Sequence, residues 1–170
     1  MSHTASPPSP PSPPSSPDEP LSLADVEATA RAAHAGQTDK AGRPYADHLR
    51  AVAEGVRRRG GDDEQIAAAW LHDAVEDDAL SERWLREAAL SRRTKDIVLA
   101  LTRRAGEPPE AYAARILATP GAPLVKEADL AHNADPARLA VLDTATRTRL
   151  TEKYTRMRAL LGLVDPDEAA

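Results

Sequence analysis

The sequence predicts an all-α protein, and three observations carry this prediction. The 170 residues include 34 Ala, 18 Leu and 18 Arg, which favour helices, whereas aromatic residues make up only 3% and Phe is absent. Apolar residues recur at spacings of three and four along most of the chain, which is the period of an amphipathic helix. No segment alternates apolar and polar residues with the period of two that half-buried strands show.

The chain is expected to hold a single domain behind an N-terminal tail. Residues 1–20 contain eight of the 15 prolines interleaved with six serines, a composition that cannot bury enough apolar surface to fold. We therefore expect a disordered tail over 1–20 and one helical domain over 21–164. A domain of that size can bury a core of its own.

Helix start and stop signals divide the first half of the domain into three helices. Ser22 is an N-cap with Asp25 three residues later, and Pro44 suits the first turn of a helix. A third helix begins near Asp62 and continues through an alanine run to Asp78. We expect helices over approximately 22–34, 44–59 and 62–78, and the middle of the third is expected to be buried.

The second half continues in the same way. Ser81 and Ser91 cap two helices, Pro108-Pro109 opens a sixth, and a seventh is expected from Pro123 to about His132. A last helix is expected from about Ala145, with an apolar stripe that favours packing on its own core, although a homodimer is an alternative use of it: Leu150, Tyr154, Met157 and Leu161. The prediction is a bundle of about seven or eight helices.

Composition also excludes several classes of protein. Without cysteine there can be no disulfide scaffold, thiol nucleophile or iron–sulfur cluster. A net charge of −5 argues against general nucleic-acid binding, and no apolar stretch approaches the roughly 20 residues that span a membrane. Residues 1–20 lack the features of a secretory signal. We expect a cytoplasmic, soluble protein that binds neither nucleic acid nor membrane.

The most informative segment is the end of the third expected helix. Residues four apart share a helix face, so His72 should lie over Glu76 and Asp73 over Asp77. Half-buried ionised groups need compensation, so either a metal ion or a cluster of arginines should lie against this polar stripe. The alternative interpretation is the solvated acidic end of a helix, with a weak pair between His72 and Glu76.

A divalent metal site needs imidazoles and carboxylates that converge from separate elements. Such a set is offered by His34, His72, Asp73 and Asp129. Two His and two Asp ligands suit Mn²⁺ or Fe²⁺, and Zn²⁺ and Mg²⁺ are compatible with them. A bound ion would lower the pKa of a water molecule, and Glu76 and Asp77 would orient that water or accept its proton.

Four blocks of sequence, in order and spacing, resemble the hydrolase domain of the RelA/SpoT-type guanosine polyphosphate (alarmone) hydrolases, within the HD-domain phosphohydrolases and closest to the small single-domain forms. The resemblance covers roughly residues 23–133. The blocks are Ala33-His34-Ala-Gly36-Gln37, Gly42-Arg43-Pro44-Tyr45-Ala-Asp-His48, Leu71-His72-Asp73-Ala-Val-Glu76-Asp77 and Leu124-Val125-Lys126-Glu-Ala-Asp129-Leu-Ala-His132-Asn133.

The resemblance implies an all-helical HD-domain fold and the hydrolytic removal of the 3′-pyrophosphate from a guanosine nucleotide. It implies that Mn²⁺ is held by His34, His72, Asp73 and Asp129, and that Glu76 and Asp77 carry the water chemistry. Asn133 would lie by the bound nucleotide. We expect the further phosphate or ribose contacts to come from Lys40, Arg43 and Tyr45.

Departures from the family pattern define the alternatives. The alarmone hydrolases carry basic residues about nine or ten positions before the first metal-binding histidine, places that fall here at Ala24 and Asp25. Hydrolysis of another nucleotide or phosphoester is therefore the second hypothesis. His48 is interpreted as a structural hydrogen-bonding histidine, and Lys126 as either a ligand contact or a structural ion pair. A third hypothesis, from another class, is a non-catalytic module that binds a phosphorylated ligand or a partner protein.

Overall fold

A computed structural model describes residues 19–163 of the chain, so 1–18 and 164–170, including most of the expected tail, lie outside the described residues. Every regular element of the described part is a helix, which confirms the all-α prediction, and an isolated bridge joins Thr38 and Pro44. The described helices are α1 (Leu23–Ala33), α2 (Tyr45–Arg58), α3 (Asp63–Leu71), α4 (Glu82–Glu87), α5 (Arg92–Leu101), α6 (Pro109–Ala118), α7 (Ala122–Asn133), α8 (Pro136–Leu139) and α9 (Thr144–Leu160).

Helix starts follow the capping signals. Ser22 Oγ accepts a hydrogen bond from the Asp25 amide at 3.1 Å, and Asp25 Oδ2 accepts one from the Ser22 amide at 3.0 Å. This reciprocal pair is a capping box, which satisfies two backbone donors that the helix leaves free. Ser81 and Ser91 cap α4 and α5 in the predicted way.

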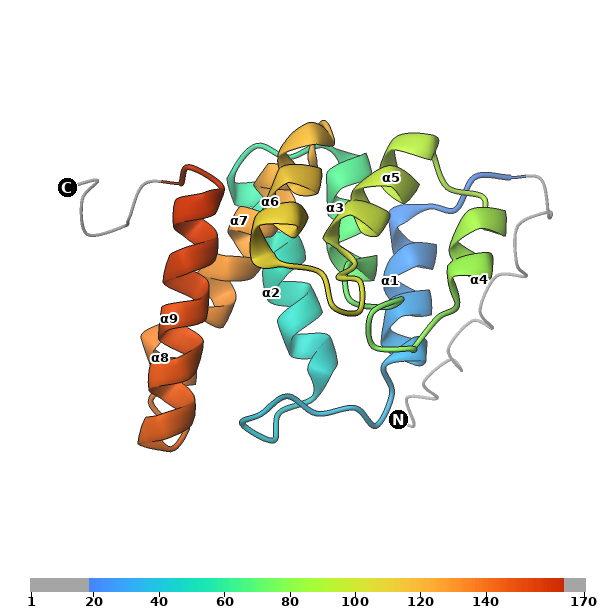
Figure 1. Cartoon of the computed structure of the whole chain (residues 1–170). Helices are drawn as coiled ribbons and strands as arrows, with labels where there is room; N and C mark the ends of the chain where they lie inside the picture. Colours follow the sequence, from blue (N-terminus) through green and yellow to red (C-terminus); the bar gives the residue numbers. More distant parts are fainter. Residues whose placement is uncertain (1–18, 164–170) are drawn as a thin grey trace, which may run out of the picture.

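The α3 helix lies at the centre of the bundle, as Figure 1 shows. Every residue from Gln65 to Leu71 is buried, and α1, α2, α5 and α7 pack against it. The small side chains of the Ala67–Ala69 run let these neighbours approach from several sides, because a helix that is apolar all round must be covered all round. The predicted burial of this helix is confirmed.

The same helix ends earlier than expected. It stops at Leu71, with His72 as its C-cap, and residues 72–78 form a series of turns, so the prediction of a helix to Asp78 is wrong. The amides of Ala79 and Leu80 both bond to the carbonyl of Ala74, and Asp78 adopts a positive φ of 55°. The acidic run from Glu76 to Asp78 therefore lies on turns that follow the helix.

The α2 and α7 helices approach closely where the later site forms. A Cβ added at Gly55 would lie 3.3 Å from the Cβ of Ala128, so glycine permits the short separation of the two backbones. Apolar residues of α2 fill the space beside α3 and α7: Leu49, Val52, Ala53 and Val56. The close packing brings the first turn of α2 beside Asp129 of α7.

The α9 helix packs on its own chain, against α6 and α7. Leu150, Met157 and Leu161 are buried and Tyr154 packs against the core, which confirms the intramolecular use of the predicted stripe. The short α8, capped by Asp135, was not expected. Within residues 19–163, no helix combines the length and apolar character needed to cross a membrane.

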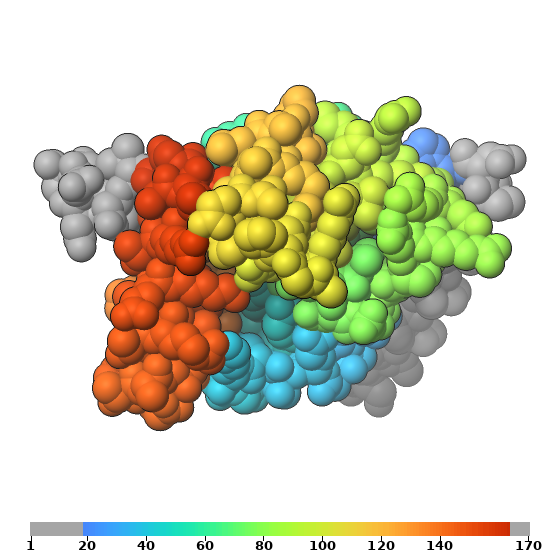
Figure 2. Space-filling view, viewed as in Figure 1, coloured from blue at the N-terminus to red at the C-terminus, as the bar shows by residue number. Residues whose placement is uncertain are grey.

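The molecular surface is hollowed between α9, the connection from α5 to α6 and the connection before α2. Figure 2 shows this recess near the middle of the face, with α2 at its back. The cavity has a volume of about 760 Å³. Residues of α7 and of the turn that follows α3 line it, so these segments carry side chains that a bound molecule would meet.

Candidate metal centre and active site

Two histidines and two aspartates meet at one point beside the cavity, and all but His48 line it. His48 comes from the first turn of α2, His72 and Asp73 from the end of α3, and Asp129 from α7. One ligand atom from each residue lies within 4.8 Å of the others. Both histidines and Asp129 are buried, and Asp73 is partly buried.

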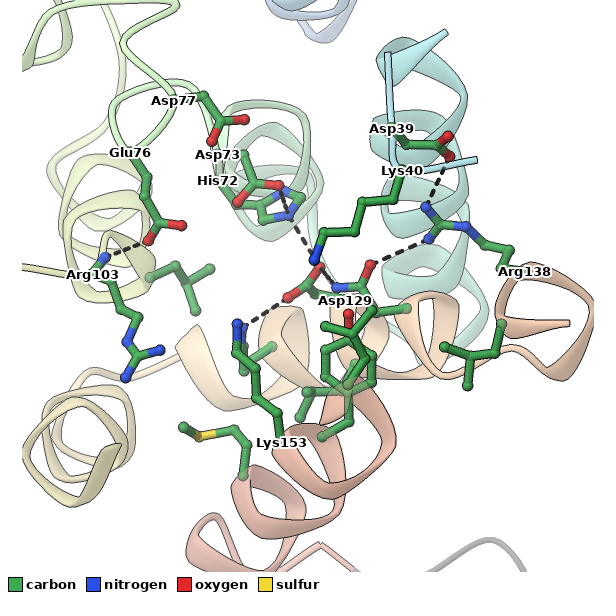
Figure 3. A pocket seen from close by; sticks show the side chains of 18 of the residues that line it. Asp39, Lys40, His72, Asp73, Glu76, Asp77, Arg103, Asp129, Arg138 and Lys153 are labelled. Atoms are coloured by element: carbon green, nitrogen blue, oxygen red, sulfur yellow. Dashed lines mark hydrogen bonds and ion pairs between the residues drawn. The ribbon is translucent and has the colours of Figure 1, made fainter. Parts of the chain in front are cut away.

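The atoms that face one another are nitrogens and carboxylate oxygens. His72 Nε2 lies 3.0 Å from Asp73 Oδ2 and 3.3 Å from Asp129 Oδ1. His48 Nε2 lies 3.2 Å from Asp129 Oδ1 and 3.6 Å from Asp73 Oδ2. In Figure 3 the His72, Asp73 and Asp129 side chains converge toward the same point.

Outer hydrogen bonds set which ring nitrogen of each histidine faces this point. His72 Nδ1 lies 2.6 Å from the carbonyl oxygen of Ala69, which can only accept, so Nδ1 carries the proton. His48 Nδ1 lies 2.7 Å from His132 Nδ1, onto which Arg138 also donates at 2.8 Å, so His48 Nδ1 is the donor there. Both Nε2 atoms therefore offer a lone pair, the arrangement that metal-binding histidines adopt.

The two carboxylates of this group need a positive charge beside them. Burial lowers the pKa of His72, but the carboxylates of Asp73 and Asp129 outweigh it and hold that pKa well above its usual value. His72 Nε2 is buried and makes no well-aligned hydrogen bond to any described residue. A divalent cation would satisfy both carboxylates and both lone pairs, so the four residues fit a first-row metal ion.

Glu76 and Asp77 stand on the turn after α3 and line the same cavity. Glu76 Oε1 accepts a hydrogen bond from the Arg103 amide at 2.7 Å, and Asp77 Oδ2 accepts one from Gln37 Nε2 at 3.0 Å. Burial raises the pKa of both carboxyl groups, and the charge of Asp73 adds to the rise. A raised pKa makes a carboxylate a stronger proton acceptor, which suits a general base.

The cavity wall carries more cations than its carboxylates neutralise. Arg138 pairs with Asp39 at 3.0 Å and Lys126 with Asp129 at 2.8 Å. Within the described part of the chain, four lining cations have no ion-pair partner: Lys40, Arg103, Arg149 and Lys153. Burial and the neighbouring charges of Arg103, Lys126 and Lys40 lower the pKa of Lys153. Figure 3 shows Lys40, Arg103 and Lys153 reaching the cavity from different sides.

Comparison with protein families identifies the domain that builds this site. The family model described as the HD domain matches residues 27–119, which is more than half of the chain and includes His48, His72 and Asp73. The chain belongs to the HD domain family.

Two relatives of this HD domain are guanosine polyphosphate enzymes by name. The chain is 43% identical over 70 residues to the probable guanosine-3′,5′-bis(diphosphate) 3′-pyrophosphohydrolase of Synechocystis sp., a match that covers 41% of this chain and 9% of the relative. It is 43% identical over 58 residues to the guanosine-3′,5′-bis(diphosphate) 3′-pyrophosphohydrolase of Haemophilus influenzae, covering 34% of this chain and 9% of that protein. The match therefore spans less than a tenth of each relative.

Three of the four predicted metal ligands lie together in this candidate metal group. His72, Asp73 and Asp129 lie in the group with His48, which was expected to be structural, whereas His34 lies outside it. His34 is the C-cap of α1, and the ring of Tyr45 lies against it at a centroid distance of 5.2 Å and against His48 at 5.5 Å. His48 shares a face of α2 with Val52 and Val56, a core-facing spacing that was available in the sequence.

Three of the four predicted substrate contacts lie at the cavity and one does not. Lys40, Tyr45 and Asn133 line the cavity, but Arg43 is not among its lining residues. The Tyr45 hydroxyl donates to Asp73 Oδ2 at 2.5 Å, and Asn133 Nδ2 donates to Asp129 Oδ1 at 3.0 Å, so both hold a ligand carboxylate. Lys126, whose role the sequence left open, makes the ion pair with Asp129.

Sequence reasoning missed three residues that support the site. Arg138 reaches His132 and Asp39, Gln37 reaches Asp77, and the Arg103 backbone holds Glu76. Gln37 lies in the first of the four sequence blocks that resemble the alarmone hydrolases, and that position could have indicated a role in the site. Arg138 and Arg103 are surface-type arginines in a chain with 18 of them, and nothing in the sequence marks them out.

Proposed function

We propose that this HD domain is a metal-dependent phosphohydrolase that removes the 3′-pyrophosphate from guanosine 3′,5′-polyphosphates. The proposal rests on one observation, which is that a metal-type ligand group, a carboxylate pair with raised pKa values and unpaired cations share one cavity. The names of the two relatives support the substrate class.

The proposed ligands are His48, His72, Asp73 and Asp129, and Mn²⁺ is the proposed ion. Two imidazoles and two carboxylates form a mixed nitrogen and oxygen set that suits Mn²⁺ or Fe²⁺, and Zn²⁺ and Mg²⁺ are compatible with it. A divalent ion bound there supplies Lewis-acid activation of a water molecule and of a phosphoryl oxygen. Tyr45, Lys126 and Asn133 hold the carboxylates in place.

Glu76 and Asp77 are the proposed catalytic residues. Each has one carboxylate oxygen engaged by the protein, Glu76 by the Arg103 amide and Asp77 by Gln37, which leaves the second oxygen of each for the attacking water. One carboxylate accepts the proton as the water oxygen bonds to phosphorus. The bond between that phosphorus and the ribose 3′ oxygen breaks, the 3′ oxygen takes up a proton, and pyrophosphate and a guanosine 5′-polyphosphate are released.

The unpaired cations are the proposed binding groups for the phosphates. Lys40, Arg103 and Lys153 line the cavity and make no ion pair with any described residue. Ammonium and guanidinium groups bind phosphate oxygens through charge-assisted hydrogen bonds, so a substrate with phosphates at two positions would satisfy several of them at once. Asn133 lies on the same wall.

A second candidate is hydrolysis of another nucleotide, and one observation favours it. Ala24 and Asp25 begin α1, where Asp25 bonds to Ser22, and they do not line the cavity. Counted from His48 instead, the family's basic positions fall at Thr38 and Asp39, which do line it. Neither is cationic, so these two positions cannot supply the basic residues that the alarmone hydrolases carry there.

Product analysis on a nucleotide panel tests the proposal. Purified protein is incubated with Mn²⁺ and guanosine 3′,5′-bis(diphosphate), its adenosine counterpart or nucleotides with a 2′- or 3′-monophosphate, and released pyrophosphate and phosphate are followed. We expect pyrophosphate release from the guanosine polyphosphate and its loss in Asp73→Ala. Turnover of another nucleotide with none of the guanosine compound would support the second candidate. Metal binding without turnover of any nucleotide would leave the non-catalytic module as the better account.

A further inference from the structure

His34 is a buried histidine without a place in the proposed metal group. It is only 2% exposed, ends α1, and its Nε2 atom makes no hydrogen bond to a described residue. Burying an imidazole costs free energy unless its nitrogens form hydrogen bonds. The hydrogen bond of the other nitrogen, Nδ1, is therefore the contact through which this buried ring can act. That contact leads to the proposed catalytic pair.

A chain of two hydrogen bonds connects His34 to Asp77 through Gln37. His34 Nδ1 lies 2.7 Å from Gln37 Oε1, and Gln37 Nε2 donates to Asp77 Oδ2 at 3.0 Å. An amide oxygen can only accept, so His34 Nδ1 is the donor. The reversed amide would place an oxygen against the Asp77 carboxylate and an N–H against a donor, so the His34 proton fixes the direction of the amide.

The His34 ring has little freedom to turn. It stacks on the Tyr45 ring at 5.2 Å between centroids and 27° between planes, and the Tyr45 hydroxyl is held by Asp73. The stacked ring aims Nδ1 at Gln37, which lies on the connection that follows α1. The chain of contacts therefore joins α1, this connection and the turn after α3. Asp77 lies on that turn, where no helix fixes its backbone.

We propose that His34 is a positioning residue that acts through Gln37 to hold the Asp77 carboxylate in its reactive orientation. The inference rests on the proposed function, in which Asp77 accepts the proton of the attacking water. One Asp77 oxygen is occupied by the Gln37 amide, so the other is directed at the water. Without the His34 donor the Gln37 amide is free to reverse, and Asp77 loses its fixed direction.

A double-mutant cycle on the full chain tests this coupling. His34→Phe keeps the ring and removes the donor, and Gln37→Met keeps the length and removes both hydrogen bonds. For each variant and for the double variant, kcat, KM for guanosine 3′,5′-bis(diphosphate) and Mn²⁺ affinity by titration calorimetry are measured. Each single change is expected to lower kcat about tenfold, as the loss of one hydrogen bond does. KM and Mn²⁺ affinity should stay within about twofold of wild type.

The double variant distinguishes the proposal from a general structural role. If His34 acts only through Gln37, the double variant is no slower than the slower single variant, whereas independent effects would multiply. His34→Asn, whose amide can donate from a similar place, should recover most of kcat. The exposed Glu54→Gln on α2 is the control and should match wild type. Multiplying losses, or a change in KM or Mn²⁺ affinity in place of kcat, would overturn the proposal.

A second readout needs no turnover and separates this inference from the proposed function. The side-chain amide signals of Gln37 are followed by ¹⁵N NMR in metal-free protein. Asp77 is exposed, so Asp77→Asn should preserve the fold. Both His34→Phe and Asp77→Asn are expected to shift these signals and to speed their hydrogen exchange, and Glu54→Gln is not. Unchanged signals in the His34 and Asp77 variants would overturn the chain of hydrogen bonds even in a protein that hydrolyses no guanosine nucleotide.

Discussion

His132 and His48 face each other through their Nδ1 atoms, 2.7 Å apart, with the rings stacked at 5.0 Å between centroids. Arg138 donates to the same His132 nitrogen and also bonds to Asp39. The His132 nitrogen is therefore an acceptor, and His48 presents its Nε2 lone pair to Asp73 and Asp129. A residue of the fourth motif that is not itself a ligand thus orients a ligand of the second.

Removing that acceptor should weaken metal binding. His132→Leu leaves the His48 ring without a partner for its Nδ1 proton, and outer partners of this kind are worth about 10- to 100-fold in metal affinity. Titration of metal-free protein with Mn²⁺ should show a loss of that size relative to Glu54→Gln. An affinity equal to wild type would mean that packing alone orients His48.

The contact between His132 and His48 should make the free energy of unfolding depend on pH. Burial, with the charges of Arg138 and His48, lowers the pKa of His132 to about 4 from an ordinary value of 6.5. Between these values the unfolded chain binds a proton that the folded chain does not, so acidification through this window destabilises the fold. Urea unfolding of metal-free protein at pH 7 and pH 5 should show a smaller loss of stability in His132→Gln than in wild type. Equal losses would place the proton uptake elsewhere.

The catalytic pair should be separable from the metal group. Glu76→Gln and Asp77→Asn keep the shape of each side chain but remove its ability to accept a proton, which contributes about 10²- to 10⁴-fold in rate. We expect kcat to fall by that range while Mn²⁺ affinity stays within a few fold of wild type. A parallel loss of Mn²⁺ binding would place these carboxylates among the ligands.

The small residues of α3 should resist enlargement. Ala68 is fully buried at the centre of the bundle, and added methylene groups there force neighbouring helices apart at a cost of about 1–3 kcal/mol. Chemical unfolding of Ala68→Leu should show a loss of this size, whereas Ala114→Leu on the exposed face of α6 should be nearly neutral. Equal stability of the two variants would contradict the tight packing of the alanine run.

The helices were predictable because their signals are local. Ser22 with Asp25, Ser81 and Ser91 mark helix starts by bonding to backbone amides a few residues away, and the structure uses all of them. The end of α3 was not predictable in this way. The turns that follow Leu71 include Asp78 in a left-handed conformation and a carbonyl of Ala74 shared by two amides, which side-chain spacing does not encode.

The sequence indicated which kinds of residue form the site better than it indicated which histidines belong to it. Adjacent His72 and Asp73, with Asp129 later in the chain, indicated a metal centre, and all three meet. Choosing between His34 and His48 required knowing which helix faces the group. Both are buried, and only the packing of α2 against α3 and α7 places His48 there. Arg138 reaches the site from a short helix that no spacing signal marked.

Measuring the bound metal decides whether His48, His72, Asp73 and Asp129 form one metal centre. Wild type, His48→Ala and His34→Asn are loaded with Mn²⁺, separated from free ion, and measured by elemental analysis. We expect one ion per chain in wild type and His34→Asn, and a loss of the ion in His48→Ala. Retention of the ion by His48→Ala with its loss from His34→Asn would contradict this expectation.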